Sequence, residues 1–370
     1  REVIPFQVEE ISSGAITYGH AQLAPSAIEI SHASEYEAKL KAAFVIARSE
    51  ERKKSILSQL EDIEKETKTK AVQTNRVLNE VLNLTEWPML TYTSFDEKFL
   101  VAPKELLISE MIEHQRYFPL EGSDGKLKNI FVITADNKLN DEIRENNQRV
   151  LSARLSDGVF LYEFDLKNQL ESFNEKLKKV TFQKDLGSVY EKMIRVKKLA
   201  LMLSDNLGMG DPALLVRAAT LCKADLATEL VGEFPDLQGT VGKHYALVQG
   251  EEKQVAQAIE EHWLPNAENG PLPESITGAI LALADKMDNL LGYFSVGLKP
   301  SSSSDPYALR RQTLGILKIL IAKEWPLDIE KLFNEAYPII GKGDNGEETV
   351  REILAFFKNR AKTIFKEYGL

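Results

Sequence analysis

Four polar residues occur on or between apolar helical faces in the second half of the chain, where apolar side chains are expected. Asp225 and His262 continue the apolar stripes of two predicted helices at helical spacing, and Asp285 lies beside a third stripe. His244 stands in a glycine-rich connection between two of these helices. A carboxylate directed at a core is costly unless it is hydrogen-bonded or ion-paired. The spacing therefore predicts that these four residues form one shared polar centre.

Carboxylates and imidazoles are common ligands of divalent metals, so a metal site is the first chemistry to consider. The order Asp…His…His…Asp on successive helices resembles the HD-type helical domain, whose hydrolytic members bind metal through His and Asp. Two features depart from that pattern: Ala224 precedes Asp225, and Lys192-Met193-Ile194 stands where an earlier histidine is expected. Hydrolysis also needs an open position for an activated water. We predict a degenerate centre with structural hydrogen bonds, no metal and no catalytic residue.

A metal-dependent HD-type phosphohydrolase that uses Asp225, His244, His262 and Asp285 remains the alternative enzyme. Other catalytic signatures are missing, since the sequence contains no P-loop, no Gly-x-Ser-x-Gly elbow and no dinucleotide-binding fingerprint. The only cysteine, Cys222, lies on an apolar helical face, so we expect it in the core rather than as a nucleophile. No run approaches the roughly eighteen apolar residues that a membrane helix needs.

Helices must position the predicted centre, because the β signal ends near residue 138. Residues 139–182 and 188–338 read as successive helices, separated by Gly, Pro and Ser breaks. The helices that carry the centre are expected at 212–231, 251–264 and 276–291, and a last amphipathic helix at 347–368.

The first 138 residues predict a mixed α+β region. Residues 1–30 are β-like, 35–84 are helical with a charge-rich exposed arm at 50–70, and Gly122–Gly125 is a hairpin-turn signal. Four β-rich runs are expected at 89–95, 99–102, 116–120 and 129–135. The fold class is thus α+β, and the expected domains are 1–138, a helical connector at 139–187, an all-α domain at 188–338 and the start of a further unit at 339–370.

The charge distribution is acidic overall, with one basic segment. A net charge of −10 argues against a broad, nonspecific nucleic-acid binder. Residues 175–198 nevertheless carry eight lysines and arginines against three acidic residues. Either this is a solvated helix face or it is a local RNA contact.

A collinear set of strings resembles the β subunit of the bacterial-type glycyl-tRNA synthetase, a two-subunit aminoacyl-tRNA synthetase. The strings span nearly the whole chain and occur in the family's order: Thr17–His20, Glu86–Pro88, Glu97–Leu100, Gln115–Pro119, Asn147–Asp157, Phe182–Gly187, Cys222–Leu226, Glu233–Tyr245, Ala284–Asp288 and Asp305–Arg311. Ala21-Gln22 departs from the Arg-Phe that the family typically has there, so a contact of that arginine is lost. The chain begins at Arg1 without a signal peptide, and we interpret it as an internal fragment.

The resemblance implies a region like the B3/B4 module of phenylalanyl-tRNA synthetase, followed by the degenerate HD-type domain. It implies that ATP, Mg²⁺ and glycine are handled by the class II site of the α subunit, and that this chain needs no cofactor. The implied partners are the α subunit and tRNA(Gly) in an α2β2 heterotetramer, in the bacterial cytoplasm, or in a plastid if the source is a plant. A helical body and an anticodon-binding domain would follow residue 370.

The implied function is to bind and position tRNA for ATP-dependent glycylation by the α subunit, with no aminoacylation by this fragment alone. Candidate phosphate contacts are Lys178, Lys179, Lys184, Arg195, Lys197, Lys198, Arg310 and Arg311. Pairing of Arg310 and Arg311 with acidic residues inside the domain is the competing interpretation. Editing is disfavoured, because glycine is the smallest substrate and a size-exclusion site has little to reject. A scaffold that mainly docks the α subunit overlaps with the RNA-binding role.

Overall fold

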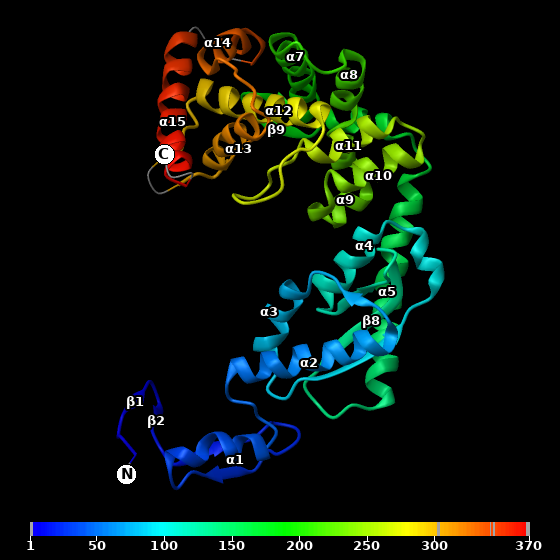
Figure 1. Cartoon of the computed structure of the whole chain (residues 1–370), viewed down its shortest axis with the longest axis vertical. Helices are drawn as coiled ribbons and strands as arrows, with labels where there is room; N and C mark the ends of the chain where they lie inside the picture. Colours follow the sequence, from blue (N-terminus) through cyan, green and yellow to red (C-terminus); the bar gives the residue numbers. More distant parts are fainter. Residues whose placement is uncertain (1–2, 302–303, 341, 343–344, 368–370) are drawn as a thin grey trace. The chain divides into compact units, whose positions relative to one another are not determined.

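A computed structural model describes residues 3–301, 304–340, 342 and 345–367, and its contacts divide the chain into two compact units. Unit 1 comprises Arg1–Phe160 and unit 2 comprises Leu161–Leu370. Unit 1 contains the larger sheet, and unit 2 is built almost entirely from helices (Figure 1). The predicted α+β class is confirmed. Among the described residues, no helix combines the length and the apolar character needed to cross a membrane.

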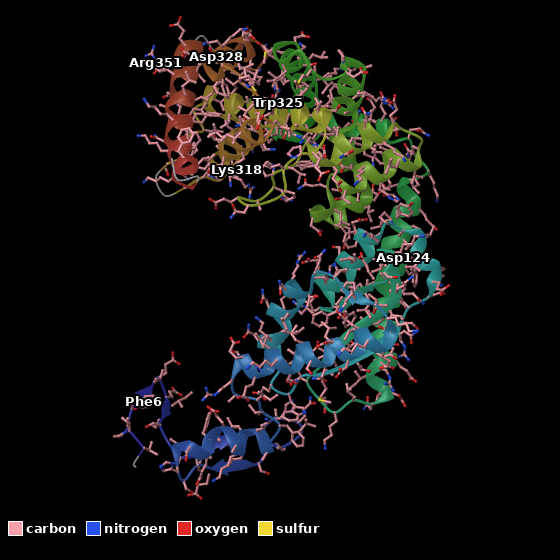
Figure 2. The ribbon with its side chains drawn as sticks, viewed as in Figure 1. Phe6, Asp124, Lys318, Trp325, Asp328 and Arg351 are labelled. Carbon is pink, nitrogen blue, oxygen red and sulfur yellow. The ribbon has the colours of Figure 1, made fainter. Side chains whose placement is uncertain are left out.

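Unit 1 starts with two small hairpins. They are formed by β1 (Gln7–Val8) with β2 (Ile11–Ser12) and by β3 (Ile16–Tyr18) with β4 (Ala27–Glu29). The first hairpin is exposed, and Phe6 beside it points into solvent (Figure 2). The short helices η1 (Ala33–Glu35) and α1 (Tyr36–Ala42) follow.

The main sheet of unit 1 is antiparallel, with strand order β5-β7-β8-β6. Its strands are β5 (Lys70–Ala71), β6 (Met89–Ser94), β7 (Phe118–Glu121) and β8 (Leu127–Ala135). Asp124 lies in the predicted turn between β7 and β8 (Figure 2), and Gly125 there has a φ of +69°, which favours glycine. Helices α2 (Ser49–Thr67) and α3 (Thr74–Leu84) pack on each other, and α2 also contacts β6.

Two expectations for unit 1 are wrong. Residues 99–102 do not form a strand, because η2 (Glu97–Val101) is a 3-10 helix whose N-cap Asp96 accepts a hydrogen bond from the backbone of Lys98. Residues 35–84 are not wholly helical, because Lys70 and Ala71 form β5; within the charge-rich arm, α2 is the mostly exposed helix that was expected, and it buries Ile56, Leu60 and Ile63. After η2 come α4 (Lys104–Ser109), a π-helical turn η3 (Glu110–His114) and, beyond the sheet, α5 (Asp141–Asp165), which continues into unit 2.

Unit 2 is organised around α12 (Ile276–Ser295), which is buried from residue 277 to residue 294. Helix α12 packs against α7 (Val189–Leu207), α8 (Pro212–Leu221), α11 (Lys253–Glu261), α13 (Leu309–Ala322), α14 (Ile329–Ile340) and α15 (Gly346–Glu367). A helix surrounded in this way has no solvated face, so any ionised group on it needs an internal partner. The remaining elements are η4 (Leu170–Phe173), α6 (Asn174–Leu177), β9 (Thr181–Gln183), β10 (Gly187–Ser188), η5 (Ala224–Ala227), α9 (Glu229–Glu233), η6 (Pro235–Leu237) and α10 (Thr240–Val248).

The boundaries in unit 2 differ from the expected ones at three places. The small antiparallel pair β9–β10 interrupts the region expected to be wholly helical, and Ser188 then begins α7 with a capping box that includes Glu191. The helix expected at 212–231 ends at Leu221, so Asp225 lies in the 3-10 turn η5. His244 lies within α10 rather than in a connection, because α10 begins at Thr240, directly after Gly239 with its φ of +85°. Residues 341, 343 and 344 of the expected break at 341–346 lie outside the described residues, and α15 begins at Gly346.

Candidate functional site

Two carboxylates on the buried helix α12 define the centre of unit 2. Asp285 is 5% exposed and Asp288 is fully buried. They are three residues apart, so both project from one side of the helix. Without counter-charges two buried carboxylates would strongly destabilise the fold. The neighbouring helices therefore have to supply cations.

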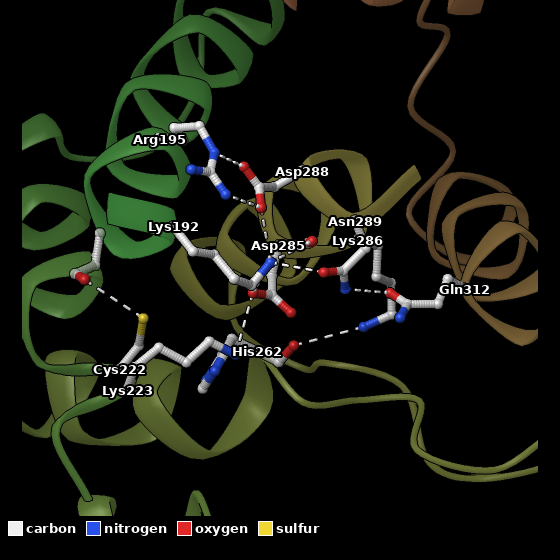
Figure 3. A network of polar contacts seen from close by, with 11 residues as sticks. Lys192, Arg195, Cys222, Lys223, His262, Asp285, Lys286, Asp288, Asn289 and Gln312 are labelled. Atoms are coloured by element: carbon white, nitrogen blue, oxygen red, sulfur yellow. Dashed lines mark hydrogen bonds and ion pairs between the residues drawn. The ribbon is translucent and has the colours of Figure 1, made fainter. Parts of the chain in front are cut away.

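Helix α7 supplies two of these cations, Lys192 and Arg195 (Figure 3). Arg195 binds the Asp288 carboxylate with two nitrogens, Nε at 2.6 Å and Nη2 at 3.2 Å, and also donates to the Leu186 carbonyl. Lys192 Nζ lies 2.9 Å from Asp288 Oδ2 and 3.1 Å from Asp285 Oδ1. The Lys192 ammonium thus bridges the two carboxylates, and Arg195 closes the cluster on the side of Asp288.

A third cation comes from the residue that precedes η5. Lys223 is 2% exposed, and its Nζ lies 3.1 Å from Asp285 Oδ1 and 3.6 Å from the ring centroid of Trp263. Burial alone would raise the pKa of Asp285, but Lys192 and Lys223 outweigh it and hold that pKa far below the ordinary value. Likewise, burial would lower the pKa of Lys192, but Asp285 and Asp288 raise it. The cluster is therefore ionic at neutral pH.

Lys192 belongs to the stretch Lys192–Ile194, in which we expected the histidine of an HD-type pattern to be absent. Its ammonium holds the two carboxylates as a fixed internal charge, and an ammonium has no open coordination position with which to activate water. Within the described ranges, no three or more His, Cys, Asp or Glu side chains are grouped closely enough to hold a metal ion. In this structure the cluster holds compensated charges inside unit 2.

Asp225 takes a different structural role. It is fully buried, and its Oδ2 accepts hydrogen bonds from the backbone N–H groups of Gly239 at 2.6 Å and Gly242 at 3.2 Å. Burial raises the pKa of Asp225 to about 6, against the opposing effect of these two N–H donors. Asp225 thereby fixes the start of α10 against η5.

The two histidines are not equivalent. His262 is fully buried at the end of α11, its Nδ1 donates to the Ile259 carbonyl at 2.6 Å, and burial lowers its pKa well below the ordinary value, so the ring is neutral. It lies beside the cluster and Trp263. His244 is half-buried on α10, and its Nε2 is 3.0 Å from the hydroxyl of Tyr162 on α5. The structure thus places Asp285 and His262 at the buried cluster, whereas Asp225 is held by the backbone of Gly239 and Gly242 and His244 contacts Tyr162.

Two buried lysines at this centre were not among the expected site residues. Lys223 precedes the Ala224-Asp225 pair, and Lys286 stands between Asp285 and Met287 on the most apolar helix of the chain. Lys286 is 4% exposed and donates to the Leu264 carbonyl at 2.6 Å. The available signal was Lys286 next to Asp285 on a helix with a continuous apolar stripe, because lysine is rarely buried without a partner.

The eight basic candidates differ in exposure. Lys179, Lys184 and Lys198 are exposed and Lys197 is half-buried. Lys178 is also exposed, but pairs with Glu175 at 2.7 Å. Arg195 is engaged in the buried cluster, and Arg310 contacts Asp305 and the Ser301 carbonyl. Arg311 is exposed and lines a pocket of about 270 Å³ together with Lys286.

The whole chain matches an aminoacyl-tRNA synthetase family. Residues 1–370 match the family model described as glycyl-tRNA synthetase beta subunit. This chain belongs to that family, which confirms the resemblance of its motifs.

Curated relatives from bacteria agree with this assignment. The chain is 41% identical over 374 residues to the glycine–tRNA ligase beta subunit of Pediococcus pentosaceus, with 98% of this chain and 54% of the relative covered. It is 40% identical over 374 residues to that of Syntrophomonas wolfei and 42% identical over 378 residues to that of Shouchella clausii, with 99% and 100% of this chain and 54% of each relative covered. The chain therefore spans about half the length of the curated relatives it matches.

Proposed function

We propose that this chain is the part of a glycine–tRNA ligase β subunit that binds tRNA(Gly) and positions it for glycylation at the active site of the α subunit. The family match over residues 1–370 carries this proposal. The ligase activity belongs to the α/β complex, which we propose to be an α2β2 heterotetramer. We assign no cofactor to this chain and place ATP and Mg²⁺ at the α subunit.

The finer architecture is part of the same proposal. Residues 1–138 would be the B3/B4-like region, 139–187 a helical connector, 188–338 the degenerate HD-type domain and 339–370 the start of a following unit. The cluster of Lys192 with Asp285 and Asp288 supports a degenerate centre, because an ammonium takes the place that a metal ligand would need. The comparisons give the phosphohydrolase alternative no support.

The exposed lysines of the basic segment are the favoured tRNA contacts. Lys179, Lys184 and Lys198 are exposed on unit 2, and Lys197 is half-buried beside Lys198 on α7. Exposed cations can reach RNA phosphates without breaking a buried ion pair, whereas Arg195 would have to leave Asp288. Lys178 would exchange its exposed partner Glu175 for phosphate at little cost.

A charge-reversal pair tests this proposal. We expect Lys197→Glu with Lys198→Glu to weaken tRNA(Gly) binding by about tenfold or more at low salt, and to reduce the slope of log K against log salt concentration by about 1 to 2. Fluorescence anisotropy of labelled tRNA across a salt series, with the full-length β subunit and the α subunit present, measures both quantities.

The matched control is Lys358→Glu with Lys362→Glu, because both lysines are exposed on α15 and the change in net charge is the same. The control should bind tRNA like the parent chain to within about twofold. Equal affinity and equal slope for the test pair and the parent chain would refute the assignment of these lysines as contacts.

A further inference from the structure

A polar pocket adjoins the buried cluster of unit 2 and is not explained by it. The pocket has a volume of about 270 Å³. Helix α12 contributes Asp285, Lys286 and Asn289 to its wall, and α13 contributes Arg311 and Gln312. The connections before α10 and after α11 contribute the rest: Gln238, Trp263, Pro265 and Asn266.

The carboxylate in the pocket wall is already neutralised. Asp285 Oδ1 lies 3.1 Å from both Lys192 Nζ and Lys223 Nζ. Asp288 behind it is bound by Arg195 and Lys192. The cluster therefore contains three cations and two carboxylates. The basic residues of the pocket wall add to this positive excess.

The pocket adds two further cations, Lys286 and Arg311. Lys286 Nζ contacts only the carbonyl oxygens of Leu264 at 2.6 Å and His262 at 3.5 Å within the described part of the chain, and no carboxylate there pairs with Arg311. Burial lowers the pKa of Lys286 to about 8, Asp285 opposes this, and Lys223, Lys192 and Arg311 add to it. The pocket is thus a region of positive potential inside an acidic protein.

Neutral donors accompany these cations. The Trp263 indole Nε1 is buried and finds no acceptor among the described atoms. Asn289 Nδ2 donates to Gln312 Oε1 at 2.8 Å, which leaves the amide group of Gln312 to donate elsewhere. Unpaired buried donors are rare and call for an acceptor.

We propose that this pocket binds a terminal phosphate group, with Arg311 and Lys286 as the charged ligands. A guanidinium fork beside an ammonium and neutral N–H donors suits a tetrahedral oxyanion better than it suits a neutral ligand. The ligand is a phosphomonoester, because Lys286 is 4% exposed and a phosphate that carries chain on both sides could not enter the pocket to reach it. Its source is either a free nucleoside monophosphate or the 5′-terminal phosphate of an RNA.

Calorimetric titration of the full-length β subunit tests the pocket, with inorganic phosphate, adenosine 5′-monophosphate and adenosine as probes. We expect saturable binding of the two phosphates and none of adenosine. Arg311→Gln should weaken phosphate binding by about fivefold or more, since it removes an exposed ligand without disturbing the core. Arg310→Gln is the matched control, because it makes the same charge change on the next residue, which does not line the pocket, and should change binding by less than about twofold.

A second variant, Lys286→Gln, should abolish phosphate binding, and circular dichroism would show whether it still folds. If Lys286→Gln does not fold, the effect of Arg311→Gln on phosphate binding decides whether the pocket is the binding site. No saturable phosphate binding by the parent chain, or an equal loss in Arg310→Gln and Arg311→Gln, would overturn the proposal.

Two short RNA hairpins that differ only in a 5′-phosphate or a 5′-hydroxyl distinguish the sources. Tighter binding of the phosphorylated hairpin, with the difference lost in Arg311→Gln, assigns the pocket to an RNA end. Equal binding of both hairpins, together with saturable nucleotide binding, assigns it to the free nucleotide. The proposal does not depend on the tRNA-binding lysines, because inorganic phosphate tests it without RNA.

Discussion

At the residue scale, Lys192 is the side chain on which the centre of unit 2 depends. Its ammonium lies within 3.1 Å of both Asp285 and Asp288, and all three side chains are almost completely buried. Removing one partner from a buried ionic cluster leaves an uncompensated charge in a low-dielectric interior. The same contact gives Lys192 a role in stability and neutralises Asp285, which lines the pocket.

Lys192→Met should lower the free energy of unfolding by about 3 kcal/mol or more, because Met preserves the volume but leaves two buried carboxylates undercompensated. The control is Lys198→Met on the same helix, where the lysine is exposed and a change within about 0.5 kcal/mol is expected. Urea unfolding followed by circular dichroism measures both. Similar stability of the two variants would show that the cluster does not hold the core.

The raised pKa of Asp225 should make the stability of the fold depend on pH. Its folded-state pKa of about 6 lies above the ordinary value of 3.8, so the folded state binds this proton more tightly than the unfolded state does. The group therefore favours folding most at pH below about 4, and that contribution is lost as pH rises to about 6.

Asp225→Asn removes this titration while the amide oxygen can still accept from Gly239 and Gly242. The stability of the parent chain relative to the variant should therefore fall by up to about 3 kcal/mol between pH 4 and pH 7. Urea unfolding of both proteins at several pH values gives the difference in their free energies of unfolding. The contributions of the other titrating groups cancel in this difference. A difference that stays constant with pH would contradict the raised pKa.

At the scale of elements, the approach of α10 to η5 and α11 depends on a glycine. A Cβ on Gly242 would lie 2.8 Å from Ile259 Cγ2 and 2.9 Å from Asp225 Oδ2. The short distance between Gly242 N and the Asp225 carboxylate exists only because nothing larger than hydrogen stands there. Helix packing and the burial of Asp225 are therefore coupled.

Gly242→Ala should destabilise the chain by about 1 to 3 kcal/mol through overpacking, even though alanine is the better helix former. Gly232→Ala in α9 is the control, because a Cβ there meets nothing within 4 Å. That variant should be neutral or up to about 1 kcal/mol more stable. Thermal unfolding compares the stability of the two variants. A Gly242→Ala variant that is more stable than the parent chain would show that α10 can move away from η5 and α11 at no cost.

At the scale of the whole molecule, each unit has its own core. Phe131 on β8 is fully buried in the sheet of unit 1, and Leu290 on α12 is fully buried among the helices of unit 2. Two compact units with separate interiors are expected to unfold as separate cooperative transitions.

Differential scanning calorimetry should therefore resolve two transitions. Phe131→Ala should lower only the transition temperature of unit 1, by an amount that corresponds to a loss of about 3 to 5 kcal/mol in unfolding free energy. Lys192→Met should lower only the transition temperature of unit 2. A single transition that both substitutions shift equally would mean that the units unfold together.

The amino-acid sequence determined the features that depend on neighbours along the chain. The apolar stripe of α12, the turn around Asp124 and the family strings were all visible there, because helical period, turn residues and motif order are local properties. The sequence also placed Asp225, His262 and Asp285 on the interior side of their elements. It did not locate the end of α8 at Leu221 or the helical setting of His244, because short 3-10 turns and helix starts after glycine have weak signals.

Only the tertiary structure decided which charges are internal. Lys192 meets Asp288 across 96 residues of sequence, and Arg195 meets it across 93. In the sequence Lys192, Arg195 and Lys198 belong to one basic segment, yet two of them neutralise buried carboxylates and the third is exposed. The charge of a buried side chain indicates which kind of partner it needs. In this cluster the partner lies on another helix, so only the packing of the helices brings the two together.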